Sequence, residues 1–317
     1  MQEDDLLATL PAIFAGDDPG VVTGSGPDDC AHVLADGRRL AFSVDAFAEG
    51  SHFLPDADPG DVAGKALGAS LSDLAASACR ARWALVSLCL RRGAGAGWAD
   101  RFARGLAAAA RRFGVTVVGG DTISSPHGTF VSVTVAGEPL PGGPLLRGGG
   151  RAGDILAVTG RLGGSIRGRH LRPEPRLREM ERLMRFCGRL EPELAFPSAA
   201  MDISDGLALD LGRLCRESGV GAVVDADAVP ISPDATALAG ESGLDPLRHA
   251  LSDGEDFELL VAFPPPVWEA FAQYDAAAEA GLARFTRIGV LTDGGGLRLR
   301  TRGGLEPLAP EGYQHRW

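Results

Sequence analysis

The sequence predicts an α/β protein, with mixed α+β sheets, that is divided into two domains. Its 317 residues exceed the usual size of a single domain, so two domains of about 150 residues are expected. Strand patterns and helix patterns alternate through both halves of the chain, as in α/β folds. A stretch rich in Gly and Pro at 139–153 separates the halves, and we place the boundary within it, giving domains 1–145 and 146–317.

The first half alternates strand and helix. The pattern predicts a strand at 38–47, a helix at 61–78, a buried strand at 83–90, a helix at 98–113 and a short strand at 115–118. Leu67, Leu71 and Leu74 recur at the spacing of one helix face. The stretch 131–135 alternates Val with Ser or Thr, which is typical of a half-exposed strand.

The second half repeats this alternation. The pattern predicts strands at 154–159, 199–203 and 258–263, and helices at 175–187 and from Leu207 through Leu214. The motifs below therefore fall at strand ends and helix starts.

Composition excludes several classes of partner. The net charge of −11 disfavours nucleic acid and anionic membranes, because both select basic surfaces. The longest apolar stretch, 83–90, is too short to span a bilayer. The start of the chain lacks a signal peptide, and five cysteines without a CxxC pair suit a reducing compartment, so we expect a cytoplasmic protein.

Aspartates flanked by small residues recur near the ends of the predicted elements. They lie in Asp28-Asp29, Ser43-Val44-Asp45, Ser72-Asp73, Gly120-Asp121 and Asp202-Ile203-Ser204-Asp205-Gly206. Two carboxylates about 4 Å apart repel by roughly 4 kcal/mol at an effective dielectric of about 20. If these groups converge, a cation between them or protonation of some of them is required. The set predicts a multi-aspartate site for divalent metal.

Each motif also has a simpler interpretation. Ser204 or Asp205 fits a helix N-cap, although the free N–H groups of such a helix start could also take a phosphate. Gly120-Asp121 fits a glycine turn with an Asx bond, and Asp28-Asp29, behind the loop 24–27, fits a solvated acidic turn. His52 fits a packed loop histidine. The metal interpretation depends on the whole set rather than on one motif.

Two common kinds of catalytic or binding machinery are not expected. The only lysine, Lys65, is followed by Ala66, so the Gly-Lys-Ser/Thr sequence of a Walker phosphate loop is absent. No Ser or Cys has a neighbouring His in the pattern, so a nucleophile–base pair is not predicted.

The motifs together resemble the thiamine-monophosphate kinases, which share a superfamily with aminoimidazole ribonucleotide synthetase and selenophosphate synthetase. The matching pieces occur in family order from residue 28 to residue 313: Asp28-Asp29-Cys30-Ala31, Ser43-Val44-Asp45, 49–53, 71–75, 119–122, Arg147, 170–176, 201–206, Gly254-Glu255-Asp256 and Gly312-Tyr313. The resemblance implies a two-domain aminoimidazole ribonucleotide synthetase-like fold. It also implies a homodimer formed by strands of the first domain.

The resemblance assigns roles to individual residues. It implies several Mg²⁺ ions, with Asp28 as a neighbour of ligands that are Asp29, Ser43, Val44, Asp45, Asp73, Asp121, Asp202 and Asp205. It implies ATP contacts from Gly120, Asp121, Arg147 and Ser204, and contacts to thiamine phosphate from His52, Glu255 and Tyr313. Among these, the residues expected to be catalytic are Asp45, Asp121 and Asp205.

The implied reaction is Mg²⁺-assisted, in-line transfer of phosphate from ATP to thiamine monophosphate, giving thiamine diphosphate. The acceptor is a phosphate monoester with a second pKa of about 6, so it is largely ionised at neutral pH and needs no general base. Two alternatives stay open: another ATP-using synthetase of the superfamily, and a non-catalytic protein that binds nucleotide or metal.

Three departures from the family are visible. Val44 stands where the family has Thr, so only its backbone carbonyl could reach a metal. A helix that the family carries between Ser165 and His170 is missing, and Arg316 is inserted near the end of the chain.

Overall fold

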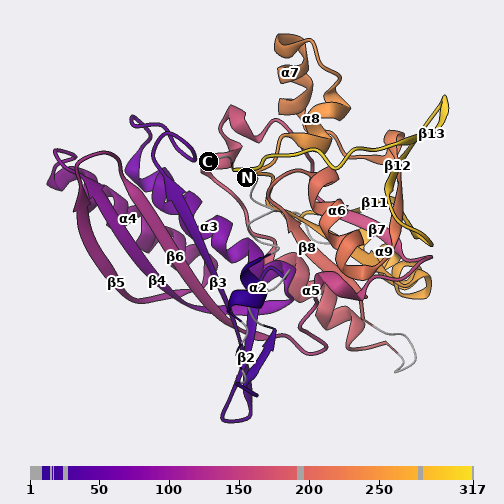
Figure 1. The fold of residues 1–317 in the computed structure, drawn as a ribbon, viewed down its shortest axis with the longest axis horizontal. Helices are drawn as coiled ribbons and strands as arrows, with labels where there is room; N and C mark the ends of the chain where they lie inside the picture. The colour runs from indigo at the N-terminus through magenta and orange to yellow at the C-terminus, as the bar shows by residue number, and fades with distance from the viewer. Residues whose placement is uncertain are drawn as a thin grey trace.

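The structure, a computed structural model, describes residues 9–14, 16, 18–23, 28–190, 196–277 and 281–315. The predicted loop at 24–27 and Arg316 lie outside these residues. The described part of the chain forms two mixed sheets, one of six strands and one of seven (Figure 1). The predicted fold class is therefore confirmed. No described helix is both long enough and apolar enough to cross a membrane.

The first sheet has the strand order β1-β2-β3-β6-β4-β5, in which only β4 and β5 run parallel. Its strands are β1 (Val21–Thr23), β2 (Ala31–Ala35), β3 (Arg38–Ala48), β4 (Cys79–Arg91), β5 (Thr116–Ser125) and β6 (Phe130–Pro139). The helices of this half are α2 (Leu10–Ile13), α3 (Pro59–Ala76) and α4 (Ala96–Phe113). Helices α3 and α4 pack on one face of the sheet, against the fully buried Val131, Val133 and Val135.

Two expectations for this half were wrong in detail. Strand β4 is buried on one face only, because Leu85, like Val44 on β3, lies on the face away from α3 and is 47% exposed. Asp45 and Asp121 lie inside β3 and β5 rather than at strand ends, because both strands continue for several residues beyond them.

The second sheet has the order β13-β12-β9-β11-β7-β10-β8, with only β9 and β12 parallel. Its strands are β7 (Ile155–Thr159), β8 (Ala199–Ile203), β9 (Gly221–Asp225), β10 (Glu258–Phe263), β11 (Phe285–Thr292), β12 (Leu297–Thr301) and β13 (Gly304–Pro307). The helices are α5 (Leu177–Cys187), α6 (Leu207–Ser218), α7 (Pro233–Ser242), α8 (Pro246–Ser252) and α9 (Pro265–Ala276).

Both faces of the second sheet are buried at β7, β8, β9 and β10. Leu156 and Val158 of β7 face a core that includes α6 and α8, whereas Ile155 and Ala157 face a core that includes α5 and α9. This arrangement explains why the strands have continuous apolar sequences instead of alternating ones. Strands β8 and β10 begin and end at the predicted residues.

Helix α3 lies between the two halves. It contacts β3, β4 and β6 of the first sheet and α5, β8 and β10 of the second half. Asp58 caps its start, accepting hydrogen bonds from Gly60 N and Asp61 N at 2.8 and 3.3 Å. The helix ends two residues before the predicted Ala78, which adopts the left-handed conformation with φ of 51°. Its position makes α3 the element that joins the two cores.

The connection where the sequence predicted a missing helix is short. Residues 164–172 are all described, and they contain only the 3₁₀ helices η2 (Ser165–Arg167) and η3 (Arg169–Leu171). The predicted deletion is therefore a tight connection rather than an open loop. The remaining 3₁₀ helices of the described chain are η1 (Arg147–Gly149) and η4 (Ala226–Ala228).

The crossing of α3 and α4 generates a prediction about stability. A methyl group on Gly105 would lie 2.4 Å from Gly60 Cα, so Gly105→Ala must push the two helices apart. We expect this substitution to lower the free energy of unfolding by about 1–3 kcal/mol, measured by urea denaturation.

Gly97→Ala is the matched control, because Gly97 lies in the same helix and a methyl group there meets no atom within 4 Å. It should raise the free energy of unfolding by about 0.4–1 kcal/mol. Equal effects of the two substitutions would show that the close crossing does not matter.

Candidate active site

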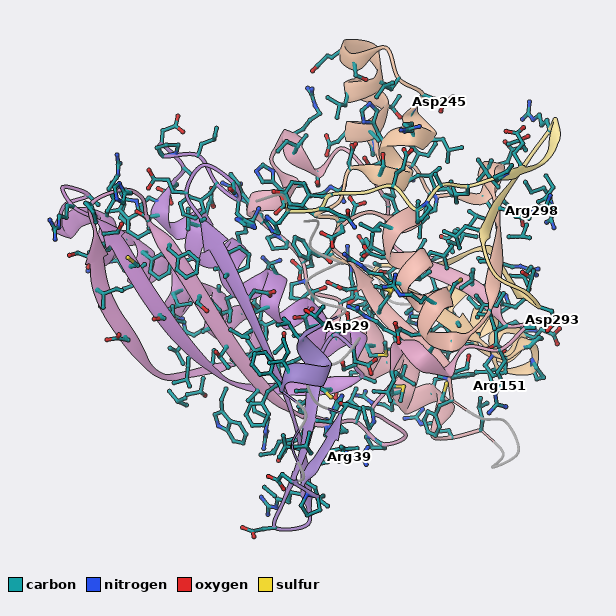
Figure 2. All side chains as sticks on the ribbon, in the orientation of Figure 1. Asp29, Arg39, Arg151, Asp245, Asp293 and Arg298 are labelled. Atoms are coloured by element: carbon teal, nitrogen blue, oxygen red, sulfur yellow. The ribbon has the colours of Figure 1, made fainter. Side chains whose placement is uncertain are left out.

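A cavity of about 1330 Å³ opens between the two domains. Every site residue predicted from the sequence lines it except Gly120 and Asp121. The predicted residues that line it are Asp29, Ser43, Val44, Asp45, His52, Asp73, Arg147, Asp202, Ser204, Asp205, Glu255 and Tyr313. Figure 2 shows Asp29 between the two sheets, far from surface groups such as Arg298 and Asp293. The fold thus brings together motifs that are distant in the sequence.

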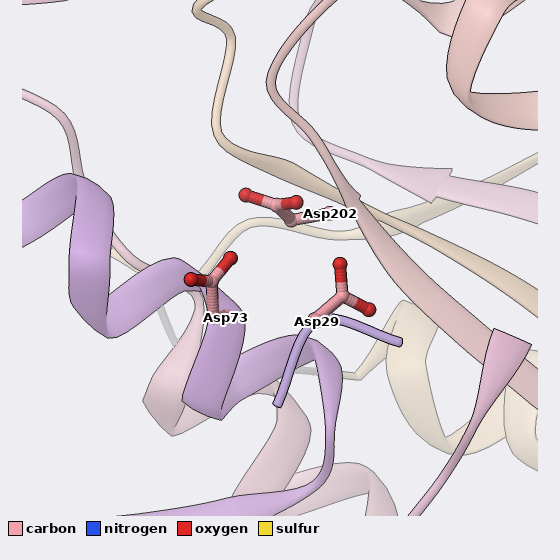
Figure 3. Close-up of side chains that lie close together, drawn as sticks. All are labelled: Asp29, Asp73 and Asp202. Carbon is pink, nitrogen blue, oxygen red and sulfur yellow. The ribbon is translucent and has the colours of Figure 1, made fainter. Parts of the chain in front are cut away.

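Three carboxylates point toward one another in this cavity (Figure 3). Asp29 comes from the segment before β2, Asp73 from α3, and Asp202 from β8. One oxygen of each lies within 4.8 Å of one oxygen of the other two. The oxygen-only ligand set suits a hard cation such as Mg²⁺ and does not suit metals that prefer nitrogen or sulfur.

The cluster resists ionisation when no metal is bound. Burial raises the pKa of Asp73 well above its ordinary value, and the neighbouring Asp45 and Asp202 raise it further. Burial likewise raises the pKa of Asp202, with Asp29 adding to the shift. This agrees with the inference from the sequence that converging carboxylates require either protons or bound cations.

Strand β3 adds two further polar side chains beside the cluster, Ser43 and Asp45. Ser43 donates a hydrogen bond to Asp73, which holds one carboxylate of the cluster in place. Burial raises the pKa of Asp45, and Asp205 and Asp29 raise it further. Val44 lies between Ser43 and Asp45, so its side chain points to the opposite face of the sheet and is 63% exposed. Only the backbone of Val44 is on the side of the cluster.

Two arginines neutralise part of this charge. The Arg147 guanidinium donates to Asp29 at 2.5 Å, and Arg147 N donates to Asp28 at 2.7 Å. Burial opposes the charge on Arg147, but Asp29, Asp210 and Asp202 together offset it and raise its pKa. Arg147 is therefore held beside the carboxylates, where it could contact phosphate groups.

Arg213 is the second arginine, and sequence reasoning missed it. Its guanidinium donates to Asp205 at 2.5 Å and to Asp210 at 3.0 Å. Asp210 is fully buried, and burial together with Asp205 raises its pKa to about 7. The signal in the sequence was the pair of charged residues Asp210 and Arg213, which are three residues apart within the predicted helix from Leu207 through Leu214. Both prove to be buried.

The start of α6 lacks the side-chain cap that the Asp202–Gly206 motif predicted. Asp210 accepts hydrogen bonds from the N–H groups of Asp205 and Gly206 at 2.9 and 3.1 Å. These two donors precede the helix, whose own first N–H group is that of Leu207. The predicted cap by Ser204 or Asp205 does not form, because Gly206 occupies the N-cap position. The side chain of a later residue reaches back and takes the place of the cap.

The other end of the cavity is aromatic. His52 Nδ1 accepts a hydrogen bond from Ala48 N at 3.1 Å, and its ring centroid lies 5.7 Å from that of Phe47 and 5.5 Å from that of His315. Tyr313 packs edge-on against His315 at 5.0 Å, and Tyr313 N donates to Asp205 O at 2.9 Å. His52 therefore belongs to a cluster of rings on the cavity wall. It does more than pack within its own loop, which was the simpler interpretation.

Gly120 and Asp121 lie apart from this cavity within one chain. Strand pairing places Asp121 in one row with Ser87, Ser132 and Ala46, on the sheet face away from α3. It is three strands from β3, a separation of about 14 Å. A methyl group on Gly120 would lie 1.9 Å from Val86 O, so contact with β4 already requires a glycine there. The predicted turn is absent, because both residues lie within β5.

One further expectation from the sequence was wrong, at the junction of α7 and α8. Ser242 Oγ lies 2.8 Å from His249 Nε2, and His249 Nδ1 lies 2.9 Å from Asp253 Oδ1, so a Ser–His pair does exist. It forms because α7 and α8 pack together, which the local sequence does not reveal. Asp253 also accepts from Gly164 N at 2.8 Å, so the chain of bonds ties α7 and α8 to the connection before η2.

Comparison with known proteins places this geometry in a family. Residues 27–138 match the N-terminal domain of the AIR synthase related proteins, and residues 151–302 match the C-terminal domain. A thiamine-monophosphate kinase of Rhodopirellula baltica is 34% identical over 308 residues, covering 96% of this chain and 91% of that protein. The chain belongs to the thiamine-monophosphate kinase family.

Other members of the thiamine-monophosphate kinase family agree. The protein of that name from Escherichia coli K12 is 34% identical, over 91% of this chain and 90% of its own. The solved structure titled AaThiL complexed with AMPPCP and TMP superposes with a TM-score of 0.82 at 27% identity, covering 99% of this chain and 97% of the other.

The pKa shifts generate a prediction about pH and Mg²⁺. The folded, metal-free chain keeps protons on Asp73 and Asp202 that the unfolded chain releases above the ordinary pKa of 3.8. The free energy of unfolding of the metal-free protein should therefore fall as pH rises above about 4. Because Mg²⁺ binds the ionised carboxylates, it should raise the melting temperature more at about pH 8 than at about pH 6.

Asp73→Asn is the informative variant, since it removes one shifted carboxyl while keeping its shape. It should weaken both the pH dependence and the effect of Mg²⁺. A Mg²⁺ effect of the same size at both pH values in the unchanged protein would contradict the proposed state of the cluster.

Proposed function

We propose that this chain transfers a phosphoryl group from ATP to the phosphate of thiamine monophosphate, giving ADP and thiamine diphosphate. The observation that carries the proposal is the carboxylate cluster Asp29, Asp73 and Asp202 in a cavity large enough for two substrates. Membership of the thiamine-monophosphate kinase family supports the choice of acceptor over those of other ATP-using synthetases.

The residues at the cluster suit a reaction between two anions. Asp29, Asp73 and Asp202 would hold Mg²⁺, which when bound offsets the charge of the phosphates. Asp45 and Asp205 form a second acidic group beside them, so we infer more than one ion. Arg147 and Arg213 already lie among these carboxylates and are placed to contact phosphate oxygens once metal occupies their present partners.

The aromatic end of the cavity suits the organic part of the acceptor. Thiamine carries a positively charged thiazolium ring, and aromatic faces attract such cations. His52, Tyr313 and His315 supply rings there, and Glu255 supplies a carboxylate. We assign thiamine monophosphate to this end and ATP to the end near Arg147 and Ser204. The reaction requires no general base, because the acceptor phosphate is already largely ionised at neutral pH.

We also infer a homodimer. The sheet face away from α3 exposes Phe42, Val44 and Leu85, and Asp121 lies on the same face. An apolar sheet face of this kind suits pairing with a second copy. In such a dimer Asp121 of one chain would face the Val44–Asp45 segment of its partner, which would give a role to a residue that one chain leaves outside its cavity.

The division of the chain at residue 145 and the cytoplasmic location of the protein both stay predictions.

The first test is formation of thiamine diphosphate by the purified protein from ATP and thiamine monophosphate. We expect product only in the presence of Mg²⁺. Asp45→Ala and Asp205→Ala should each lower kcat by about 100-fold or more, because both remove charge beside the transferred phosphate.

Circular dichroism and the melting temperature serve as controls, since both variants should stay folded. Turnover close to that of the unchanged protein in either variant would rule out that residue as part of the site. Absence of product, with ATP still bound, would point to another acceptor or to a non-catalytic protein.

The dimer is tested by mixing two inactive variants during expression, Asp121→Ala and Asp73→Ala. If Asp121 serves the partner's cavity, each mixed dimer contains one complete site. Random pairing then restores about a quarter of the normal activity, since half of the dimers are mixed and each has one working site of two.

The control is the mixture of Asp45→Ala with Asp73→Ala, because both of these residues line the same cavity of one chain. This mixture should stay inactive. Lack of activity in the first mixture, with dimers confirmed by light scattering, would show that Asp121 does not act across the interface.

A further inference from the structure

The only lysine of the chain lies behind the acceptor end of the cavity. Lys65 is on α3, its side chain is 1% exposed, and its Nζ lies 2.5 Å from Glu255 Oε1. The chain has 31 lysines and arginines, so the other basic positions are all arginine. A buried ammonium group is costly unless it is paired, and burial lowers the pKa of Lys65 while Glu255 opposes that shift. The contact with Glu255 supplies the partner that the buried ammonium group needs.

Glu255 is the half of the pair that faces the cavity. Its side chain is 30% exposed and lines the cavity beside His52 and Tyr313. Lys65 does not line the cavity. The cation thus holds one carboxylate oxygen from behind, while the rest of the carboxylate remains open to a ligand.

The backbone at Glu255 is constrained as well. Glu255 and Phe257 adopt the left-handed region, with φ of 53° and 51°. Glu255 N donates to Ser204 O at 2.6 Å, and Phe257 N donates to Ile203 O at 2.8 Å. Strained conformations of non-glycine residues persist only where surrounding contacts enforce them, and they cluster at binding sites. Backbone and ion pair together fix where the Glu255 carboxylate points.

Helix α3 links this carboxylate to the metal cluster. Lys65 and Asp73 are eight residues apart on the same helix, a rise of about 12 Å. Lys65 reaches the second domain at Glu255, and Asp73 reaches Asp202 of that domain. One rigid element therefore sets the spacing between the metal site and the acceptor end.

We propose that Lys65 is a positioning residue for thiamine monophosphate and that it acts through Glu255. The inference deepens the proposed function and rests on it. A carboxylate paired with a lysine accepts hydrogen bonds through its remaining lone pairs, so it selects a ligand group that donates. The exocyclic amino group of the aminopyrimidine ring is such a donor, whereas the proposed function assigns ATP to the other end of the cavity, near Arg147 and Ser204.

The experiment compares the KM values of the two substrates in Lys65→Met. Loss of a hydrogen bond to a charged group weakens binding by about 10–100-fold. We expect the KM for thiamine monophosphate to rise by about that factor, while the KM for ATP changes by less than about 2-fold. A purely structural role for Lys65 would lower the melting temperature without separating the two KM values.

Arg172→Met is the matched control. Arg172 pairs with Asp61 at 2.9 Å, so it also joins α3 to the second domain, but neither residue lines the cavity. It should leave both KM values unchanged. If it raises the KM for thiamine monophosphate as much as Lys65→Met does, the effect comes from the contact between the domains, and the proposal is overturned.

Two further variants test whether Lys65 acts through Glu255. Glu255→Gln keeps Lys65 and the side-chain shape, so it stays informative even if Lys65→Met does not fold. We expect it alone to raise the KM for thiamine monophosphate, and we expect the double variant Lys65→Met/Glu255→Gln to raise it no further. A normal KM in Glu255→Gln, or additive effects in the double variant, would overturn the proposal. Lack of thiamine diphosphate from the unchanged protein would instead overturn the proposed function.

Discussion

Repulsion between buried carboxylates governs the organisation of this molecule. Asp29, Asp73 and Asp202 come from three elements of two domains and meet within 4.8 Å. When these carboxylates are ionised, their repulsion opposes the packing of α3 against the second domain unless positive charge is close. Arg147 supplies some of that charge at Asp29, and Arg213 supplies some at Asp205. The cavity is thus a place where folding alone leaves charge only partly balanced, and this imbalance favours binding of metal ions.

Helix α3 can occupy its central position because of its small residues. Leucines at 67, 71 and 74 give one apolar stripe, which was visible in the sequence. Ala63, Ala66 and Ala69 are also buried, and Gly68 lies against Pro173, where a methyl group would come within 2.9 Å of the ring. Small side chains let neighbours approach from several directions at once. The same helix can then present Asp73 to one side and Lys65 to another.

The predictability of each part follows from how local its cause is. Strands β8 and β10 were predicted to the residue because both of their faces are buried, so their sequences are continuously apolar with sharp ends. The aspartate set was found because small neighbours mark it. The position of Asp121 was not predicted, since it depends on strand register and on which face the side chain takes. The pairs Arg213–Asp205 and Ser242–His249 were missed because helix packing creates them.

The burial of Lys65 gives the folded chain an unusual chemical property. Every other basic side chain is a guanidinium or an imidazole, so the described surface offers no lysine amine to an acylating reagent. Acylation of Lys65 requires α3 to move away from Glu255, which is a separation of the two domains at this helix. The rate of modification at this single position therefore reports how often the domains part, without any label having to be introduced.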